Sequence, residues 1–567
     1  MYSRSSKFLA LADDIYHHAL ACAPGKASLS TLSSIAGLLL FLSVGRTHWL
    51  LILLCAAVVQ WMLSCCKAWN STLTQLPGPW YAPFTNLHLQ YLFSRGTVPD
   101  FVQAAHARYG PVVRLGPRQV WISDKAALKQ ILSTVDLPKV AMYAEISREK
   151  ESAGLFGEVR PSVHTKLKKM LSPSFTVGYC DKLDQFFQKP LIDTYNVYRK
   201  ELAKCAREGK PLVLERNFME DIHKIALEIM GECCFGRGFG SVAAEKATPE
   251  PGIDLKTWLN IPNVVFSGTK MRYRLVYLKR FLRTCGINLQ FDWPYGMMKA
   301  IDLVVRRRQA QLKSPDPEFE PRQDLLQHLV TDGKRPDNGV KMNSRDILDQ
   351  MGELLLAGTE TTSATIAYLF LELARNPDVK EKLFRTLPAM DLADALVDGK
   401  TVRSDPQYEY LQACIKENLR MHPIASEMGR KTGKEPVLIG GFVYPPHTVI
   451  SASYKDLHYN PAYWPEPNRF WPERFLSKDS PLHDGVAPAY DSSAYWPFSG
   501  GAHSCIGMNF AWHEQRIVAA NMLSRFDIEE LAQPPLKLRQ FITIQFHDGK
   551  WMARLKPRLP VDGSAFI

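Results

Sequence analysis

The sequence predicts a mainly α-helical protein with a small β region, in which one large domain follows an N-terminal membrane anchor. Helical periodicity dominates the chain from residue 86 onward, and no internal repeat or low-complexity stretch interrupts it. Patterns typical of β-strands are confined to residues 112–124 and 437–453. The 567 residues are 46% hydrophobic and 22% charged, which is the composition of a folded globular protein.

An apolar region near the N-terminus predicts the membrane anchor. After a mixed segment at residues 1–30, the anchor is expected at residues 31–66. A spanning helix needs roughly 20 mostly apolar residues, and the run at residues 49–66 meets the lower end of that range. The shorter run at residues 32–44 is a candidate second apolar segment, so one span and two spans both remain open. The competing interpretations are a cleaved signal peptide and a buried core helix.

A proline-rich hinge is predicted between the anchor and the body. Residues 67–85 include Pro77, Pro79 and Pro83, which cannot continue a helix and stiffen the chain into an extended segment. The domain that carries the chemistry is therefore expected at residues 86–567.

The charge balance and the cysteines narrow the class of protein. The net charge of +12 favours anionic membrane surfaces or acidic partner proteins, and no motif indicates nucleic-acid binding. The eleven cysteines show no CxxC or Cys/His zinc spacing, which excludes a zinc site and a disulfide scaffold. Reduced cysteines fit a body that faces the cytosol.

One long helix is predicted at residues 344–375. Asn376 and Pro377 end it, as an N-cap followed by proline at the first position of the next helix. Within it, residues 356–362 (LAGTETT) are expected to interrupt the helix, because glycine costs about 1 kcal/mol in a helix interior and threonines favour other conformations. A simple kink is the structural alternative.

The strongest chemical signal is a glycine-rich turn around one cysteine. The stretch from Phe498 to Gly507 is FSGGAHSCIG, and a helical pattern begins just beyond it. A cysteine at a helix N-terminus has its thiolate favoured by the helix dipole and by free backbone N–H groups. Glycines also let a backbone approach a flat ligand closely. For a lone cysteine, the alternative is a buried structural residue in a turn.

The spacing Phe-x2-Gly-x3-Cys-x-Gly resembles the haem-binding signature of the cytochrome P-450 family. The resemblance implies the P-450 fold, haem b as cofactor, and Cys505 as the axial ligand of its iron. It also implies that Phe498 packs near the sulfur, that Gly501 and Gly507 belong to the haem-binding site, and that His503 lies near a propionate. Many members carry Arg at the position of His503, so a weaker or pH-dependent contact is expected there.

Two further motifs concern the scaffold. Glu417 and Arg420 are three residues apart on a predicted helix, so their side chains can pair. Taken alone, such a pair is commonly a solvated surface pair. With Arg474, they resemble the buried Glu-Arg-Arg set with which the family fixes the fold around its cysteine loop, a structural role.

The threonine-rich stretch of the long helix resembles the oxygen-binding helix of the family. There, a small residue and a glycine leave room for O2, and an acid–alcohol pair delivers protons. Glu360 and Thr361 occupy the positions of that pair, so the resemblance implies a catalytic role for both. Protons are needed because heterolysis of the O–O bond requires protonation of the departing oxygen.

Haem propionates need cationic or hydrogen-bonding partners. Arg430, ten residues beyond the paired arginine, matches a propionate contact of the family. His164 and Lys168 resemble the family's Trp-x3-Arg pair, with His in place of Trp and Lys in place of Arg. With Lys168, Lys166 and Lys169 are candidates for a docking face for an acidic redox partner, and an ordinary exposed helix face is the alternative.

The resemblance implies an enzyme that hydroxylates or otherwise oxidises a hydrophobic small molecule with O2. Electrons are expected from NADPH through a FAD/FMN flavoprotein reductase, with cytochrome b5 as a second candidate donor. The motif style indicates a fungal enzyme of specialised metabolism in the endoplasmic reticulum membrane, with its catalytic domain facing the cytosol. Two alternatives are an O2-independent haem-thiolate isomerase or dehydratase and a haem-binding sensor without turnover.

Overall fold

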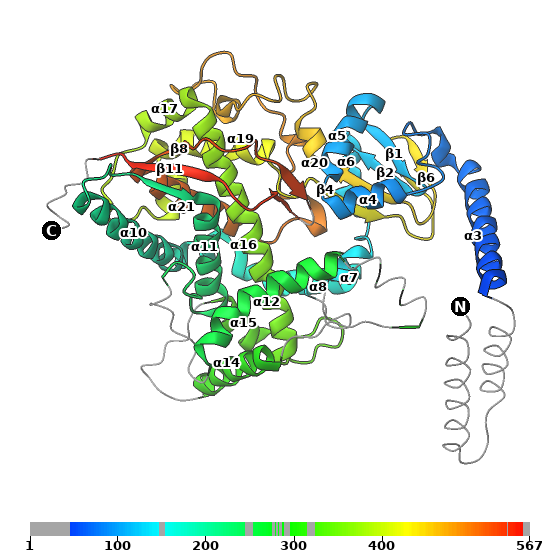
Figure 1. The fold of residues 1–567 in the computed structure, drawn as a ribbon, viewed down its shortest axis with the longest axis horizontal. Helices are drawn as coiled ribbons and strands as arrows, with labels where there is room; N and C mark the ends of the chain where they lie inside the picture. Colours follow the sequence, from blue (N-terminus) through cyan, green and yellow to red (C-terminus); the bar gives the residue numbers. More distant parts are fainter. Residues whose placement is uncertain are drawn as a thin grey trace, which may run out of the picture. The chain divides into compact units, whose positions relative to one another are not determined.

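The computed structural model describes residues 46–146, 154–243, 253–274, 278, 282, 286–287, 295–313, 324–540 and 543–559 (Figure 1). The chain divides into two compact units, Met1–Ser71 and Thr72–Ile567. The predicted N-terminal segment at residues 1–30 and the first apolar run at residues 32–44 lie outside the described residues.

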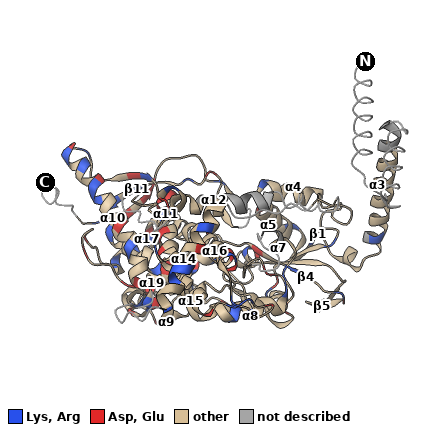
Figure 2. Cartoon of the chain, turned by 90° about the horizontal axis from the view of Figure 1, so that it is seen from below, with Lys and Arg blue, Asp and Glu red and all other residues tan. Residues whose placement is uncertain are grey.

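The described part of the first unit forms one helix, α3 (Arg46–Trp69). It carries no charge between residues 51 and 66, and Lys67 lies in its last turn (Figure 2). The large apolar side chains that it exposes are Leu51, Ile52, Leu53, Leu54, Val58, Val59, Trp61, Met62, Leu63 and Trp69.

Among the described residues, the helix that fits a membrane span by length and hydropathy lies in the second unit. The helix that is long and apolar enough to cross a membrane is Ser344–Arg375, and 67% of its most apolar window is buried inside the body. Burial of that degree marks a core helix of the second unit. The segment Leu51–Lys67 of α3 is a shorter apolar helix.

The second unit is mostly helical. Its α-helices are α4 (Leu87–Arg95), α5 (Val98–Tyr109), α6 (Lys125–Lys129), α7 (Met142–Ile146), α8 (Pro161–Leu171), α9 (Val177–Lys182), α10 (Asp184–Arg207), α11 (Phe218–Met230), α12 (Leu255–Arg274), α14 (Tyr295–Lys313), α15 (Leu325–Asp332), α16 (Ser344–Arg375), α17 (Pro377–Thr386), α18 (Gly399–Ser404), α19 (Glu409–Met421), α20 (Tyr454–His458) and α21 (Met508–Arg525).

Short helical turns connect these helices. The 3₁₀ turns are η1 (Thr72–Gln75), η3 (Ser172–Phe175), η6 (Pro406–Tyr408), η7 (Pro472–Phe475), η8 (Ser492–Ala494) and η9 (Gly501–His503), and the π-helical turns are η2 (Gln130–Thr134) and η4 (Gly231–Phe235).

Four small sheets accompany the helices. The largest has the strand order β1-β2-β7-β4, with β1 (Val112–Gly116), β2 (Gln119–Ile122), β7 (Val449–Ser453) and β4 (Glu427–Lys431). Within it β2 and β7 are parallel and the other pairs are antiparallel. The other sheets are β3-β11-β8, β10-β9 and β5-β6, built from β3 (Leu214–Asn217), β5 (Val437–Ile439), β6 (Phe442–Tyr444), β8 (Phe526–Glu530), β9 (Leu538–Gln540), β10 (Ile544–Phe546) and β11 (Met552–Pro557).

The predicted strands lie in two of these sheets. The stretch at residues 112–124 contains β1 and β2, as predicted. The stretch at residues 437–453 divides, because β7 joins the largest sheet whereas β5 and β6 pair with each other around Gly440 and Gly441. Both glycines have positive φ, which suits a tight turn. The largest sheet lies with α4, α5 and α20 at one end of the unit, and the long helices lie at the other end (Figure 1).

The helix α16 runs through the core of the helical part. Asn343 and Asp346 form a capping box at its start. Contrary to the expected interruption, the helix is continuous through residues 356–362. At its end, Asn376 precedes α17 as predicted, but its side chain donates back to the carbonyl oxygen of Glu372 at 2.8 Å and so caps α16.

Candidate functional site

The cysteine loop, residues 498–507, contains η9 and leads into α21. The N–H of Cys505 donates to the carbonyl oxygen of Phe498 at 2.9 Å, which closes the loop across the glycines. Gly501 has a φ of 67°, and a Cβ there would lie 1.9 Å from the carbonyl oxygen of Leu132 in η2. Only glycine therefore fits where the loop meets η2. Gly507 is the last residue before α21. A Cβ at this position would lie 4.0 Å from the sulfur of Cys505.

Cys505 has accessible surface although many protein atoms surround its thiol. Burial raises the pKa of this thiol, whereas the Gly507 N–H and the Lys168 ammonium lower it. The predicted influence of the helix N-terminus is present in the Gly507 N–H, but the effect of burial on the pKa is larger.

Arg430 is a fully buried cation on β4. Within the described residues, none of its three guanidinium nitrogens has a hydrogen-bond partner. Burying an unpaired guanidinium is costly, so this position is built for an anion. The carboxylate of a haem propionate is an anion of the right kind.

Two histidines lie beside this arginine. The rings of His164, on α8, and His503, in the cysteine loop, have centroids 4.3 Å apart. The Nδ1 atoms of both rings are buried, with no hydrogen-bond partner among the residues that the structure describes. Burial first, and then nearby cations including Arg430, lowers the pKa of each histidine to about 3. Both are neutral without an anion, and both offer hydrogen-bonding nitrogens to one.

Lys168 makes contacts with the cysteine loop. Its Nζ donates to the carbonyl oxygens of Ala502 and Ser504 at 2.9 and 2.8 Å, and to the Ser504 hydroxyl at 2.9 Å. These hydrogen bonds connect α8 to the cysteine loop. Its propionate contact stays a prediction.

Lys139 belongs to the same cluster of cations and was missed by the sequence analysis. It pairs with Arg430 through an isolated β-bridge, and it is 8% exposed. Burial lowers the pKa of its ammonium to about 7. Its only sequence signal is a lysine in an otherwise apolar stretch, LPKVAM, and that pattern alone does not indicate an anion site.

The two proposed proton-delivery residues lie in the middle of α16. The hydroxyl of Thr361 donates to the carbonyl oxygen of Ala357 at 2.5 Å, one turn earlier. Glu360 is partly exposed, and its carbonyl oxygen accepts from the Gln545 side chain at 2.8 Å. Gly358 has a packing role, because a Cβ there would lie 2.3 Å from the sulfur of Met230 on α11. Packing against Met230 is enough to explain a glycine at this position, and a role of Gly358 in making room for O2 stays a prediction.

The Glu-Arg-Arg set comes together inside the protein. Arg420 forms two hydrogen bonds with the Glu417 carboxylate, both at 2.8 Å, and Arg474 lies 3.5 Å from the same carboxylate. All three side chains are buried. Arg420 also donates to the carbonyl oxygen of His458, which precedes the cysteine-loop region. The set therefore ties α19 to the chain that leads into the loop.

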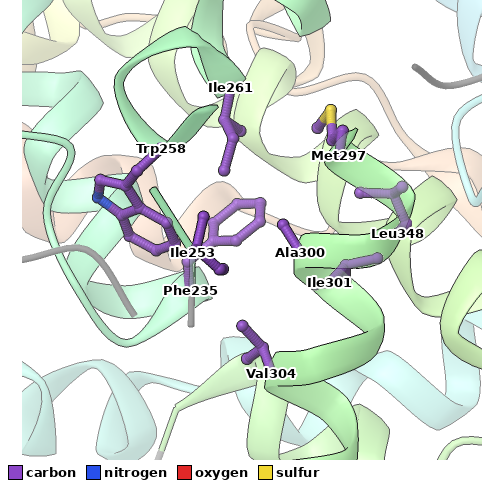
Figure 3. Close-up of a pocket in the computed structure, with 9 residues that line it drawn as sticks. All are labelled: Phe235, Ile253, Trp258, Ile261, Met297, Ala300, Ile301, Val304 and Leu348. Carbon is purple, nitrogen blue, oxygen red and sulfur yellow. The ribbon is translucent and has the colours of Figure 1, made fainter. Parts of the chain in front are cut away.

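A separate apolar pocket lies between α12, α14 and α16 (Figure 3). Its lining residues are Phe235, Ile253, Trp258, Ile261, Met297, Ala300, Ile301, Val304 and Leu348. The indole N–H of Trp258 donates to the carbonyl oxygen of Gly238 at 3.0 Å, so the pocket presents no free polar group from that ring. None of the predicted site residues lines this pocket.

Comparison with known proteins gives a consistent result. The sequence model of the family "Cytochrome P450" matches residues 76–550. The chain is similar to cytochrome P450 monooxygenase FUS8 of Gibberella moniliformis, with 28% identity over 81% of this chain and 84% of that protein. It is also similar to cytochrome P450 monooxygenase acrD of Aspergillus aculeatus (27% identity; 88% and 94%) and to helB1 of Aspergillus fumigatus (25%; 81% and 74%).

Proposed function

This chain belongs to the cytochrome P450 family and is a monooxygenase, and we propose that the thiolate of Cys505 is the ligand of its haem iron. The observation that supports this assignment best is the buried, unpartnered guanidinium of Arg430. Burial lowers the pKa of His503, two residues before the cysteine, and the charge of Arg430 lowers it further. One anionic cofactor beside Cys505 would satisfy both side chains.

The residues present fit haem b. Arg430, His503 and His164 would hold the propionates, and Phe498 and the loop glycines would pack near the sulfur. Haem with a thiolate ligand supplies an iron centre that favours cleavage of the O–O bond. Lys168 holds the loop carbonyls and keeps Cys505 in one position relative to α8.

Glu360 and Thr361 would supply protons. Glu360 is partly exposed, so its carboxyl group can exchange protons with water. The adjacent Thr361 hydroxyl donates within its own helix, which leaves its lone pairs available to accept a hydrogen bond from water or an acid. This pair accounts for oxygen activation, which an isomerase, a dehydratase or a sensor would not need.

We further propose that α3 anchors the enzyme in the endoplasmic reticulum membrane with its body in the cytosol. Support comes from the exposed apolar side chains of α3, which water solvates poorly. The domain arrangement predicted from the sequence, with an anchor at 31–66, a hinge at 67–85 and a haem domain at 86–567, belongs to this proposal. A bilayer location suits a hydrophobic substrate.

The proposed electron donor is a membrane-bound NADPH-dependent FAD/FMN reductase, with cytochrome b5 as a second donor. The net charge of +12 favours an acidic partner protein. The similar enzymes come from fungi, which supports a substrate from fungal specialised metabolism.

Co-expression of the chain with a fungal reductase tests this function. Microsomes should consume NADPH and O2, and extracts of the expressing host should contain products heavier by one oxygen that are absent without the gene. A matched chain with Cys505→Ala should give neither signal. Equal product from both chains would contradict the proposal.

A further inference from the structure

The short loop at residues 154–158 is held by side chains on both sides. From α16, Gln350 accepts the N–H of Leu155 at 3.2 Å, and Glu353 accepts the N–H of Phe156 at 2.9 Å. The next N–H along the loop also points to Glu353, at 3.4 Å. One carboxylate therefore binds two consecutive peptide groups, an interaction stronger than that between neutral groups.

Lys139 binds the same peptide groups through their carbonyl oxygens. Its Nζ donates to the carbonyl oxygens of Leu155 at 3.0 Å and Phe156 at 2.9 Å. Loops usually satisfy such groups with water. Here a buried lysine and a carboxylate hold the donors and the acceptors of one short segment, which fixes its backbone.

The approach of the loop to α16 depends on a glycine. A Cβ on Gly154 would lie 2.2 Å from the Glu353 carboxylate. A larger residue would push the carboxylate away from the two peptide N–H groups that it binds. Gly154, Glu353 and Lys139 thus form one clamp.

The clamp sets the position of an aromatic side chain. The ring of Phe156 meets that of Tyr143 edge to face, with centroids 5.1 Å apart. The Tyr143 hydroxyl donates to the sulfur of Met428 at 2.8 Å, on the strand that carries Arg430. Contacts therefore lead from the ring of Phe156, through Tyr143 and Met428, to the strand that carries Arg430.

The clamp also shares a helix face with the proposed proton-delivery residues. Glu353 precedes Glu360 by seven residues on the continuous helix α16, which corresponds to about two turns and about 10 Å. Glu353 and Glu360 therefore lie on the same face of α16.

We propose that Glu353 and Lys139 are positioning residues that hold Phe156 as a rigid wall of the substrate space and so limit the bulk of ligands that reach the iron. This inference rests on the proposed function. Neither residue touches the reacting atoms, and both act through Phe156. Removal of the carboxylate should loosen the wall without changing the iron ligand.

Two azoles that bind haem iron through nitrogen provide the test, because they differ in bulk. The probes are imidazole and clotrimazole, titrated into the full-length enzyme and followed by the shift of the Soret band. In Glu353→Ala the ratio of clotrimazole affinity to imidazole affinity should rise about tenfold. Only the bulky azole has to displace the loop, and the loop is then no longer held by a charge-assisted hydrogen bond. Glu353→Gln keeps an acceptor oxygen and should restore the wild-type ratio.

Hydrogen exchange gives a second readout, which does not depend on haem. The N–H groups of Phe156 and Gly157 should exchange faster in Glu353→Ala than in the wild type. Glu381→Ala, which removes an exposed acid on α17, is the control and should change neither readout. If Glu353→Ala fails to fold, Gly154→Ala breaks the same contact from the loop side and should give the same result.

The outcomes separate this inference from the proposed function. A wild-type protein without haem would contradict the proposed function. A haem-containing Glu353→Ala or Gly154→Ala enzyme with an unchanged azole ratio, or with unchanged exchange at residues 156–157, would contradict the clamp alone.

Discussion

Arg430 is a buried charge whose surroundings indicate the kind of ligand that the protein binds. Its side chain is fully buried, and its guanidinium nitrogens have no hydrogen-bond partner in the described part of the chain. A cation in that state destabilises the protein unless an anion binds it. The stability of the folded state is therefore expected to depend on the cofactor.

Thr361 is expected to control proton delivery. In Thr361→Ala, NADPH oxidation should continue while product per NADPH falls about tenfold and hydrogen peroxide accumulates, because the departing oxygen is no longer protonated in time. The measurement is the ratio of peroxide to NADPH consumed in reductase-supplemented microsomes. Thr365→Ala, one turn along α16, removes a hydroxyl bonded to the Thr361 carbonyl oxygen and is the control. Unchanged coupling in Thr361→Ala would refute the proton-relay role.

Residues that belong to a spaced motif can be proposed from the sequence, whereas residues outside such a motif cannot. Cys505, Glu417 and Arg420 stand at fixed offsets from glycines or from each other, so their partners can be inferred from the spacing. Lys139 joins Arg430 only through a bridge between segments almost 300 residues apart, a contact that no local pattern shows.

Among the elements, the cysteine loop depends most strictly on its backbone. Gly501 has a positive φ and lies against the backbone of η2, whereas Gly549 has a similar φ of 64° with nothing within 4 Å of its missing Cβ. A substitution at Gly549 therefore tests the effect of the left-handed backbone alone, whereas one at Gly501 adds the effect of a steric clash.

Gly501→Ala should therefore destabilise the protein more than Gly549→Ala. The control should lose about 1 kcal/mol of unfolding free energy from its left-handed backbone alone. Gly501→Ala should lose about 3 kcal/mol, because the added methyl also displaces the loop from Leu132. Urea denaturation measures both. Equal losses would show that the contact with η2 is unimportant.

The sequence predicted the elements with strong local periodicity. The long helix at residues 344–375 and the strands β1 and β2 lie where they were predicted. The sheet β3-β11-β8 was not predicted, because its strands come from residues 214–217 and from two later segments, and their pairing depends on tertiary contacts. The expected break in α16 is absent, since packing against α11 at Gly358 overrides the weak helix propensity there.

At the scale of the whole molecule, the two units differ in how many large apolar side chains they expose. The described part of the first unit exposes large apolar side chains, and the second unit buries most of its own. An exposed apolar surface of this kind is typical of a helix that a membrane or a partner protein covers.

Removal of residues 1–71 should leave the catalytic body intact and transfer it to the soluble fraction. The second unit begins at Thr72, so the deletion ends where its own contacts begin. Fractionation of expressing cells, together with haem content, measures the result. Full-length protein that is already soluble would contradict the anchor, and so would a truncated protein that stays entirely in the membrane pellet.

The spectrum of the reduced carbon monoxide complex tests the central claim most directly. The purified wild-type enzyme should show the Soret band typical of thiolate-ligated haem. Cys505→Ala should lack that band, and Cys180→Ala, which removes a buried cysteine on α9, should keep it. A thiolate-type band that persists in Cys505→Ala, or a colourless wild-type protein, would contradict the account.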